Sequence, residues 1–389
     1  MIESILDDDL YKFTMQQAVL ETYPNAIAKY EFISRKSWAA TPEFLRLLQQ
    51  EVYKLKGLRL SDWERIHLAE ACPFLKPGYL SYLADYKYDP NQLNVKTEDG
   101  YLKIGIEGTW HSTILWEVKL LALISECYFQ TIDQKWNYDG QVEKIRTKGA
   151  HLNAAMAKFA DFGTRRRRSF ESQRIVVETL AGIPNFVGTS NVYLALKNKV
   201  KPIGTMAHEW LMGISGLESL RHANRYALNA WNQVYRGDLG IALTDTFGTE
   251  AFFEDFSMEL AKLYDGVRHD SGCPFGFAER VVEFYRNLRI DPSTKTIVFS
   301  DGLDVETAIK LVLHCKNLGI RCSFGIGTNF TNDFENSPAL NIVIKLRSIK
   351  KDALSRWIQV VKLSDVLTKA TGDSDALRVA KYIFYGTPL

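Results

Sequence analysis

The sequence alternates short apolar runs with amphipathic stretches from about residue 153 to residue 346, and this alternation constrains the fold more than any other feature. The amphipathic stretches have about ten to twenty residues, a length typical of helices. Strands alternating with such helices form parallel βα units, and about seven or eight units favour a closed or nearly closed barrel. The predicted strands are residues 160–163, 183–188, 203–207, 239–244, 266–268, 296–300, 322–325 and 341–346.

The chain before the predicted barrel has a different organisation. Residues 27–110 alternate shorter strand-like and helical runs that proline punctuates, which predicts a separate α/β layer. Residues 116–130 are predicted to form a long helix that leads into the barrel, and the tail from residue 347 is expected to fold back onto the first layer. We therefore predict two domains, one of residues 1–125 with 350–389 and one of residues 126–349.

Composition and charge exclude several classes of protein. The chain of 389 residues is 46% hydrophobic with a formal charge of +2, so neither a nucleic acid nor a membrane is an expected partner. Five scattered cysteines include no CxxC pair, which argues against a zinc site or a disulfide framework. Apolar runs are too short for a transmembrane helix. We expect a cytoplasmic protein.

The N-terminus is acidic, which is wrong for a signal or transit peptide. Asp7, Asp8 and Asp9 stand at the start of a predicted helix over residues 7–23, which ends before Pro24. Carboxylates at a helix N-terminus can cap it and suit its dipole. The three aspartates are therefore predicted to cap this helix.

The stretch KPIGTMAHEW, residues 201–210, combines the predicted central strand with a histidine and a carboxylate. His208 and Glu209 come directly after the strand, where α/β proteins usually place their chemistry. An imidazole there can act as base, acid or nucleophile. The alternative is a structural histidine that makes a single hydrogen bond.

Polar residues cluster at the predicted ends of the strands, which converge on one mouth in a barrel. Gly325, Gly327 and Thr328 form a glycine turn suited to a phosphate, and Asp301 with Gly302 ends the preceding strand similarly. The other candidates are Arg165 to Arg168, Thr189, Ser190, Asn191, Thr205, Asp245, Arg268, His269, Asp270 and Ser271.

Two groups among these candidates have open roles. The four arginines at 165–168 cannot all face the mouth, but at least one is expected to meet a diphosphate or a carboxylate. Asp245 and Asp270 either cap helices or hold ribose hydroxyls, a metal or His208. The residues together predict a sugar-phosphate or nucleotide enzyme without identifying the reaction.

Ten ordered motifs resemble the nicotinate phosphoribosyltransferase family over nearly the full length of the chain. They are DLYKFTM at 9–15, TILWE at 113–117, DFGTRR at 161–166, GTSN at 188–191, GTMAH at 204–208, LTDTF at 243–247, VRHDSG at 267–272, FSDGLD at 299–304, GIGT at 325–328 and NIVIKL at 341–346. The resemblance implies an irregular α/β barrel of the type II phosphoribosyltransferases joined to an α/β-sandwich domain, in a homodimer.

The resemblance also implies an activity. The family joins nicotinate to 5-phosphoribosyl 1-diphosphate, giving nicotinate mononucleotide and diphosphate for NAD salvage. ATP hydrolysis is coupled through a phosphohistidine, which matches His208 here, and Mg²⁺ is the expected ion with unknown protein ligands. The alternatives are an enzyme that uses nicotinamide, the decarboxylating quinolinate enzyme, and a non-catalytic relative that binds nucleotides.

The resemblance assigns roles by position. Catalysis would fall to His208, Asp245 and Glu209, with Glu209 as a candidate to orient the imidazole and His269 as the next candidate for phosphorylation. Nicotinate would be bound by Tyr11, Phe162, Ser190, Thr205 and Arg268. Phosphoribosyl diphosphate would be bound by Arg165, Arg166, Asp270, Ser271, Asp301, Gly302, Gly327 and Thr328.

The sequence departs from the family pattern at two places. Cys273 stands where the family usually has an acid, which puts a metal or nucleotide role for that position in doubt. Residues 366–368 replace the usual Pro-Gly turn after the KLSD motif at 362–365, which is expected to loosen the tail.

Overall fold

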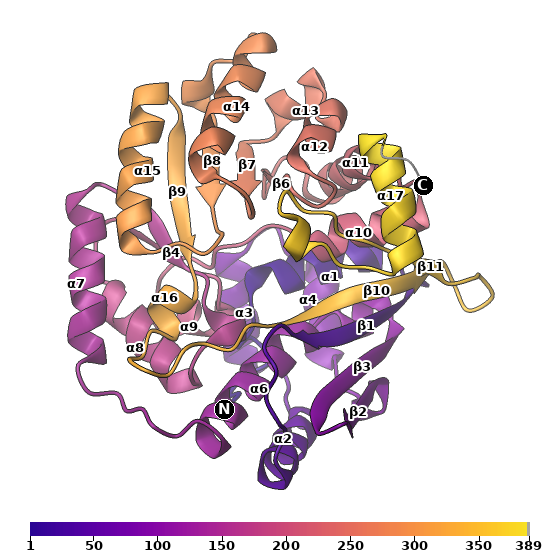
Figure 1. The fold of residues 1–389 in the computed structure, drawn as a ribbon, viewed down its shortest axis with the longest axis vertical. Coiled ribbons are helices and arrows are strands. Elements are labelled where there is room, and N and C mark those ends of the chain that lie inside the picture. The colour runs from indigo at the N-terminus through magenta and orange to yellow at the C-terminus, as the bar shows by residue number, and fades with distance from the viewer. Residues whose placement is uncertain (387–389) are drawn as a thin grey trace.

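The strands of the protein form two sheets, which occupy separate parts of the molecule (Figure 1). The structure is a computed structural model that describes residues 1–386. One sheet is antiparallel and has the order β11 (Ile358–Gln359), β10 (Ile342–Lys350), β1 (Ile27–Ser34), β3 (Tyr101–Thr109) and β2 (Leu93–Glu98).

The antiparallel sheet is built mainly from the N-terminal part of the chain. Ala28, Tyr30 and Phe32 of β1 are buried on one face, as the two-residue period of a strand requires. β10 pairs with β1, so residues 342–350 belong to this sheet and not to the barrel, contrary to the sequence prediction. The helices of this region are α1 (Leu10–Thr22), α2 (Pro42–Leu55), α3 (Asp62–Ala71), α4 (Pro77–Asp85), α5 (Trp110–Thr113) and α6 (Trp116–Thr131).

The second sheet is parallel and carries the barrel region, in the order β5 (Phe186–Thr189), β4 (Phe159–Asp161), β9 (Arg321–Ile326), β8 (Thr296–Phe299), β7 (Gly266–His269) and β6 (Ile241–Leu243). The βα alternation predicted from the sequence is therefore confirmed. Its helices are α7 (Gln141–Ala154), α8 (Phe170–Leu180), α9 (Val192–Lys197), α10 (His208–Leu217), α11 (Ala223–Tyr235), α12 (Thr249–Asp255), α13 (Met258–Leu263), α14 (Pro274–Asn287), α15 (Val305–Leu318) and α16 (Thr328–Thr331).

The predicted central strand, residues 203–207, is not a regular strand. Pro202, just before it, forms one parallel bridge to Thr189 of β5, and the Thr205 hydroxyl donates to the Ile241 carbonyl of β6 at 3.1 Å. Gly188 lets the backbones meet, because its φ is +138° and a Cβ there would lie 1.9 Å from the Lys201 carbonyl oxygen. The segment thus spans the gap between the two edge strands and makes the barrel irregular.

The C-terminal tail contacts both parts of the protein, whereas the sequence predicts contact with the first layer alone. β11 extends the antiparallel sheet. Further along, the Leu363 amide donates to the Thr246 carbonyl, and Phe384 of α17 (Ser374–Tyr385) stacks on Phe247 with ring centroids 5.1 Å apart. The tail therefore lies over residues that follow β6.

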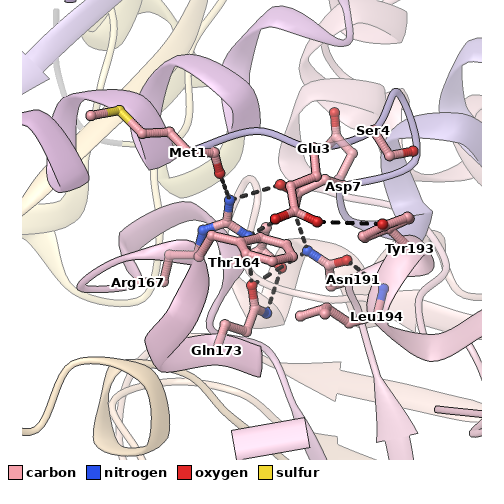
Figure 2. Close-up of polar contacts among 12 residues, drawn as sticks. Met1, Glu3, Ser4, Asp7, Thr164, Arg167, Gln173, Asn191, Tyr193 and Leu194 are labelled. Carbon is pink, nitrogen blue, oxygen red and sulfur yellow. Dashed lines mark hydrogen bonds and ion pairs between the residues drawn. The ribbon is translucent and has the colours of Figure 1, made fainter. Parts of the chain in front are cut away.

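Asp7 and Asp8 are buried ion-pair partners, and the three N-terminal aspartates do not act as the predicted side-chain caps. α1 begins at Leu10, and its cap residue Asp9 makes no capping side-chain hydrogen bond. Asp7 receives two hydrogen bonds from Arg167, at 2.7 and 2.8 Å, and one from Asn191 (Figure 2). Asp8 lies 3.2 Å from Lys119 of α6. The Asp7 contacts attach the start of the chain to the barrel, and the Asp8 pair attaches it to α6.

The helix α6 lies at the junction of the two parts, and almost all of its residues are buried. It packs against α2 on one side and against the turn at residues 164–166 on the other. None of the described helices combines the length and the apolar character needed to cross a membrane.

Candidate active site

A cavity of about 830 Å³ lies between the carboxyl ends of the parallel strands and β10. Two of the predicted site residues, Asp245 and Ser271, do not line it. They lie directly behind its wall, where Ser271 contacts Asp245 and Asp245 contacts the lining residue His208. The predicted residues that line the cavity are Tyr11, Phe162, Arg165, Arg166, Ser190, Thr205, His208, Glu209, Arg268, Asp270, Asp301, Gly302, Gly327 and Thr328.

His208 is the first residue of α10 and is 6% exposed at the cavity wall. Its Nε2 lies 2.7 Å from Oδ1 of Asp245 and 3.6 Å from Oδ2 of Asp270. Because Asp245 is ionised, Nε2 carries the proton and donates a hydrogen bond to the carboxylate. The Nδ1 lone pair is then free to act as a nucleophile.

Asp245 is fully buried and is held by several donors. The Ser271 hydroxyl donates to its Oδ2 at 2.7 Å, and Nζ of Lys362 lies 2.9 Å from the same oxygen. The Ser364 hydroxyl is 3.3 Å from Oδ2 as well. Burial alone would raise the pKa of Asp245, but His208 and Lys362 hold it well below its usual value. Asp245 therefore remains an anion that orients the imidazole.

Burial lowers the pKa of His208 to about 4, and the positive charge of Lys362 acts in the same direction. The attraction of Asp245 opposes this shift without overcoming it. The imidazole is consequently neutral near pH 7, which is the state a nucleophilic histidine requires.

Glu209 does not orient the imidazole, contrary to the expectation from its position beside His208. Its Oε1 accepts hydrogen bonds from the Tyr30 hydroxyl at 2.6 Å and from Nε1 of Trp110 at 2.8 Å, and its Oε2 lies 2.5 Å from Nζ of Lys12. The helical backbone directs consecutive side chains to different faces, so Glu209 turns away from its neighbour. Asp245 supplies the orienting contact instead.

The run of four arginines divides into two pairs. Arg165 and Arg166, the two that the family resemblance assigns to phosphoribosyl diphosphate, line the cavity. Arg167 is bound to Asp7, and Arg168 donates to Ser337 while its guanidinium lies 3.4 Å from the ring centroid of Phe129. A 3-10 turn at residues 164–166 produces this division, because it changes the direction of successive side chains.

The two glycine turns lie side by side, because β8 and β9 are neighbours in the sheet. Gly302 has a φ of +56°, which an ordinary side chain adopts at a cost. Gly327 caps the short helix α16, and Thr328 begins it. Asp301 lies 2.5 Å from Nζ of Lys369. The paired turns can present backbone N–H groups to one phosphate.

The expected nicotinate residues surround another part of the cavity wall. Tyr11 and Phe162 both line it, and Gly325 accommodates the Phe162 ring, which would lie 2.2 Å from a Cβ at that position. Arg268 donates to the Ser300 hydroxyl at 3.0 Å and to the Met206 carbonyl at 3.2 Å. These bonds hold its guanidinium against the cavity.

Ser190 and Thr205, the remaining expected nicotinate ligands, already use their hydroxyl protons. The Ser190 hydroxyl donates to Asp9 at 2.6 Å, and the Thr205 hydroxyl donates to the backbone of β6. A bound carboxylate would have to compete with these acceptors for the two protons.

Sequence reasoning missed several cavity residues that come from distant segments. Lys345 lies on β10, and burial, together with Lys362, lowers its pKa to about 7. Lys362 and Lys369 come from the tail, and Arg35 follows β1. The family-like motifs NIVIKL and KLSD contain Lys345 and Lys362, so their presence in those motifs was the available signal.

His269, the alternative phosphorylation candidate, is sealed in apolar packing. It is 2% exposed, both ring nitrogens lack hydrogen-bond partners, and its ring lies against Phe277 and Phe299. Burial lowers the pKa of His269, so it is neutral in the folded protein. It is therefore a core residue.

His208, Asp245 and Asp270 could together hold a metal ion, since one ligand atom from each lies within 4.8 Å of the others. Mg²⁺ prefers oxygen ligands and usually keeps waters or substrate phosphates in its shell. Both oxygens of Asp245 already have partners, whereas Oδ2 of Asp270 faces the site. Asp270 is thus the carboxylate that fits Mg²⁺ best.

Comparisons with known proteins agree along the whole chain. Residues 6–125 match the nicotinate phosphoribosyltransferase N-terminal domain, and residues 157–387 match the nicotinate phosphoribosyltransferase family. The nicotinate phosphoribosyltransferase of Methanosarcina acetivorans is 51% identical, with 98% of each chain covered. The crystal structure of the Porphyromonas gingivalis nicotinate phosphoribosyltransferase is 38% identical, with a TM-score of 0.96 over 99% of this chain and 100% of that one. The Vibrio cholerae structure is 36% identical, with a TM-score of 0.93 over 100% and 94%.

Proposed function

This chain belongs to the nicotinate phosphoribosyltransferase family, and we propose that it joins nicotinate to 5-phosphoribosyl 1-diphosphate. The products are nicotinate mononucleotide and diphosphate, and the pathway is NAD salvage. We include in the proposal that ATP drives the reaction through phosphorylation of His208. The observation that carries it is the neutral, oriented imidazole beside a cavity with paired glycine turns and two arginines.

The main reaction exchanges one bond at the anomeric carbon. The ring nitrogen of nicotinate supplies the electron pair for the new C–N bond, and the C–O bond to diphosphate breaks with its electrons leaving on oxygen. The transition state resembles an oxocarbenium ion, so positive charge develops on the ribose and negative charge on the leaving group. The enzyme must stabilise both charges.

The cavity residues suit these two charges. Arg165 and Arg166 would hold the departing diphosphate, and Asp270 and Asp301 would hold the phosphoribosyl group, while Ser271 acts from behind the wall through Asp245. Gly302, Gly327 and Thr328 would bind the 5-phosphate. Tyr11 and Phe162 would stack on the pyridine ring, and Arg268, with Ser190 and Thr205, would bind its carboxylate. Tyr11 and Phe162 line one cavity in a single chain, which supports the proposal that both rings stack on the same pyridine ring.

The coupled step transfers the γ-phosphoryl group of ATP to Nδ1 of His208. The P–O bond to ADP breaks as the P–N bond forms, and water later releases inorganic phosphate. Asp245 stabilises the imidazolium character that develops at Nε2, and the N-terminus of α10 favours the added negative charge. When bound at Asp270, Mg²⁺ would neutralise phosphate charge.

We further propose that the enzyme is a cytoplasmic homodimer. The expectation rests on the family resemblance. Sedimentation of the purified chain would measure the oligomer directly.

The experiment that tests the function combines turnover with labelling. The purified protein is incubated with nicotinate, 5-phosphoribosyl 1-diphosphate and Mg²⁺, and nicotinate mononucleotide is measured with and without ATP. In parallel, γ-labelled ATP should leave an acid-labile, base-stable label on the protein. His208→Asn should lose the label and the stimulation by ATP, because asparagine offers no nucleophilic nitrogen.

The matched control is His67→Asn on α3, because His67 is only half-buried and does not line the cavity. This variant should keep both the label and the turnover. Label retained in His208→Asn would place the phosphoryl group elsewhere and overturn this part of the proposal. Absence of nicotinate mononucleotide formation by the wild-type protein would overturn the assigned reaction.

A further inference from the structure

A buried ion pair joins the residue after Tyr11 to the residue after His208. Lys12 is on α1 and Glu209 is on α10, and Nζ of Lys12 lies 2.5 Å from Oε2 of Glu209. Lys12 is fully buried and Glu209 is 6% exposed. A charge pair in such surroundings is screened little by solvent. Two residues with separate proposed roles are thereby linked through their immediate neighbours.

The pair is fixed from several directions. Glu209 also accepts hydrogen bonds from Tyr30 of β1 and Trp110 of α5, so its carboxylate has partners on three elements besides its own. Lys12 lies 2.5 Å from Glu117 of α6 as well. Attraction to Glu117 and Glu209 outweighs burial and raises the pKa of Lys12, which therefore stays charged.

The backbones beside this pair are equally close. The Thr14 hydroxyl of α1 donates to the carbonyl of Thr205 at 2.6 Å, just before α10 begins. A Cβ on Gly204 would lie 3.0 Å from the Tyr11 amide nitrogen. If the first turn of α1 were displaced, it would therefore press against the segment that leads into His208.

We infer that Lys12 and Glu209 are positioning residues that couple the nicotinate site at Tyr11 to the nucleophile His208. The inference rests on the proposed function and goes beyond it, because neither residue contacts the reacting atoms in that mechanism. Nicotinate stacked on Tyr11 would restrain the first turn of α1, and the ion pair would transmit this restraint to the first turn of α10. Phosphorylation of His208 would conversely favour nicotinate binding, as reciprocity requires.

The two helices provide their own control. At their other ends, the Tyr23 hydroxyl after α1 donates at 3.0 Å to Glu218 after α10. This contact is exposed and lies at the far end of both helices from Tyr11 and His208. Glu218→Gln thus disturbs the same pair of helices without touching the Lys12–Glu209 pair.

The test compares Glu209→Gln with Glu218→Gln in the full-length protein. Glutamine keeps an oxygen for Tyr30 and Trp110 but removes the charge that Lys12 meets. Glu209→Gln should weaken the effect of ATP on the KM for nicotinate by at least about fivefold, the lower range of allosteric coupling. The KM for 5-phosphoribosyl 1-diphosphate should change less, and Glu218→Gln should keep the wild-type coupling.

Lys12→Arg is the second variant, because it retains the charge and should retain most of the coupling. A general loss of stability would lower activity at every substrate without changing the ratio of KM values measured with and without ATP. Equal effects in Glu209→Gln and Glu218→Gln, or an unchanged ratio in Glu209→Gln, would overturn the inference while wild-type turnover still supports the proposed function. A wild-type protein that fails to use nicotinate would overturn both.

Discussion

Nζ of Lys362 lies 2.9 Å from Oδ2 of Asp245, so a residue of the C-terminal tail neutralises the carboxylate that orients His208. The tail therefore contributes to the site and does not merely cover it. Lys362 also lowers the pKa of His208, second only to burial.

Replacing Lys362 with methionine should raise the pKa of His208 from about 4 towards its ordinary value, because the repelling charge is removed. A protonated imidazole has no free lone pair, so the acid limb of phosphoryl transfer should shift to higher pH. The measurement is the pH profile of label uptake from γ-labelled ATP. Lys351→Met, in the exposed turn after β10, is the control. Identical profiles in both variants would contradict the role of Lys362.

Replacing Arg268 with alanine should raise the KM for nicotinate much more than the KM for 5-phosphoribosyl 1-diphosphate. Loss of a charge-assisted bidentate contact to a carboxylate typically costs about 1.5–3 kcal/mol, or roughly 10- to 150-fold in affinity. Steady-state kinetics with each substrate varied in turn provides the measurement. The loss should be absent for nicotinamide, which has no carboxylate, and equal damage to both KM values would count against the assignment.

Replacing Arg167 with methionine should destabilise the fold by about 3–5 kcal/mol, since Asp7 would be left as an uncompensated buried charge. Burial raises the pKa of Asp7, and Arg167 more than reverses that shift, so the carboxylate depends on its partner. Urea unfolding measures the change. Arg174→Met removes half-exposed surface pairs of α8 and should cost no more than about 1 kcal/mol. Similar losses in the two variants would be inconsistent with a buried Asp7–Arg167 pair.

Replacing His269 with leucine should reduce the loss of stability in acid. The folded pKa of His269 lies below the ordinary 6.5, so this residue contributes its full stability above pH 6.5 and loses it as the pH falls towards the folded value. The unfolded chain binds the proton first in that window. Thermal unfolding at pH 5 and pH 8 should show a smaller difference for the variant than for the wild type. An equal or larger difference would argue that His269 has a hydrogen-bond partner in solution.

The sequence pattern sufficed for the parallel βα units, because each depends on local periodicity and on turn residues next to it. It also indicated the paired glycine turns and His208, whereas Arg165 and Arg166 were singled out from the four arginines only by the family resemblance. The predictions that were wrong concern residues whose partners are far away in the sequence. Asp7 is bound to Arg167 rather than capping α1, and Glu209 is bound to Lys12 rather than to His208.

A partner that is distant in the sequence also explains why the last predicted barrel strand was assigned to the wrong sheet. Residues 341–346 have the apolar pattern of a barrel strand, but the hydrogen bonds of β10, which contains most of them, go to β1, more than three hundred residues earlier in the chain. Periodicity records which face of a strand is buried and carries no information about the neighbouring strand. Only the pairing in the folded chain could assign β10 to the antiparallel sheet.

The sequence by itself determined the classes of element, the family and the residue types available for phosphoryl and ribosyl chemistry. The tertiary structure alone decided which carboxylate meets His208, which lysine neutralises that carboxylate and which glutamate turns away. Local periodicity is encoded over a few residues, whereas ion pairs and pKa values depend on burial and on charges brought together by distant segments. Asp245 and Lys362, separated by more than one hundred residues, are the clearest example.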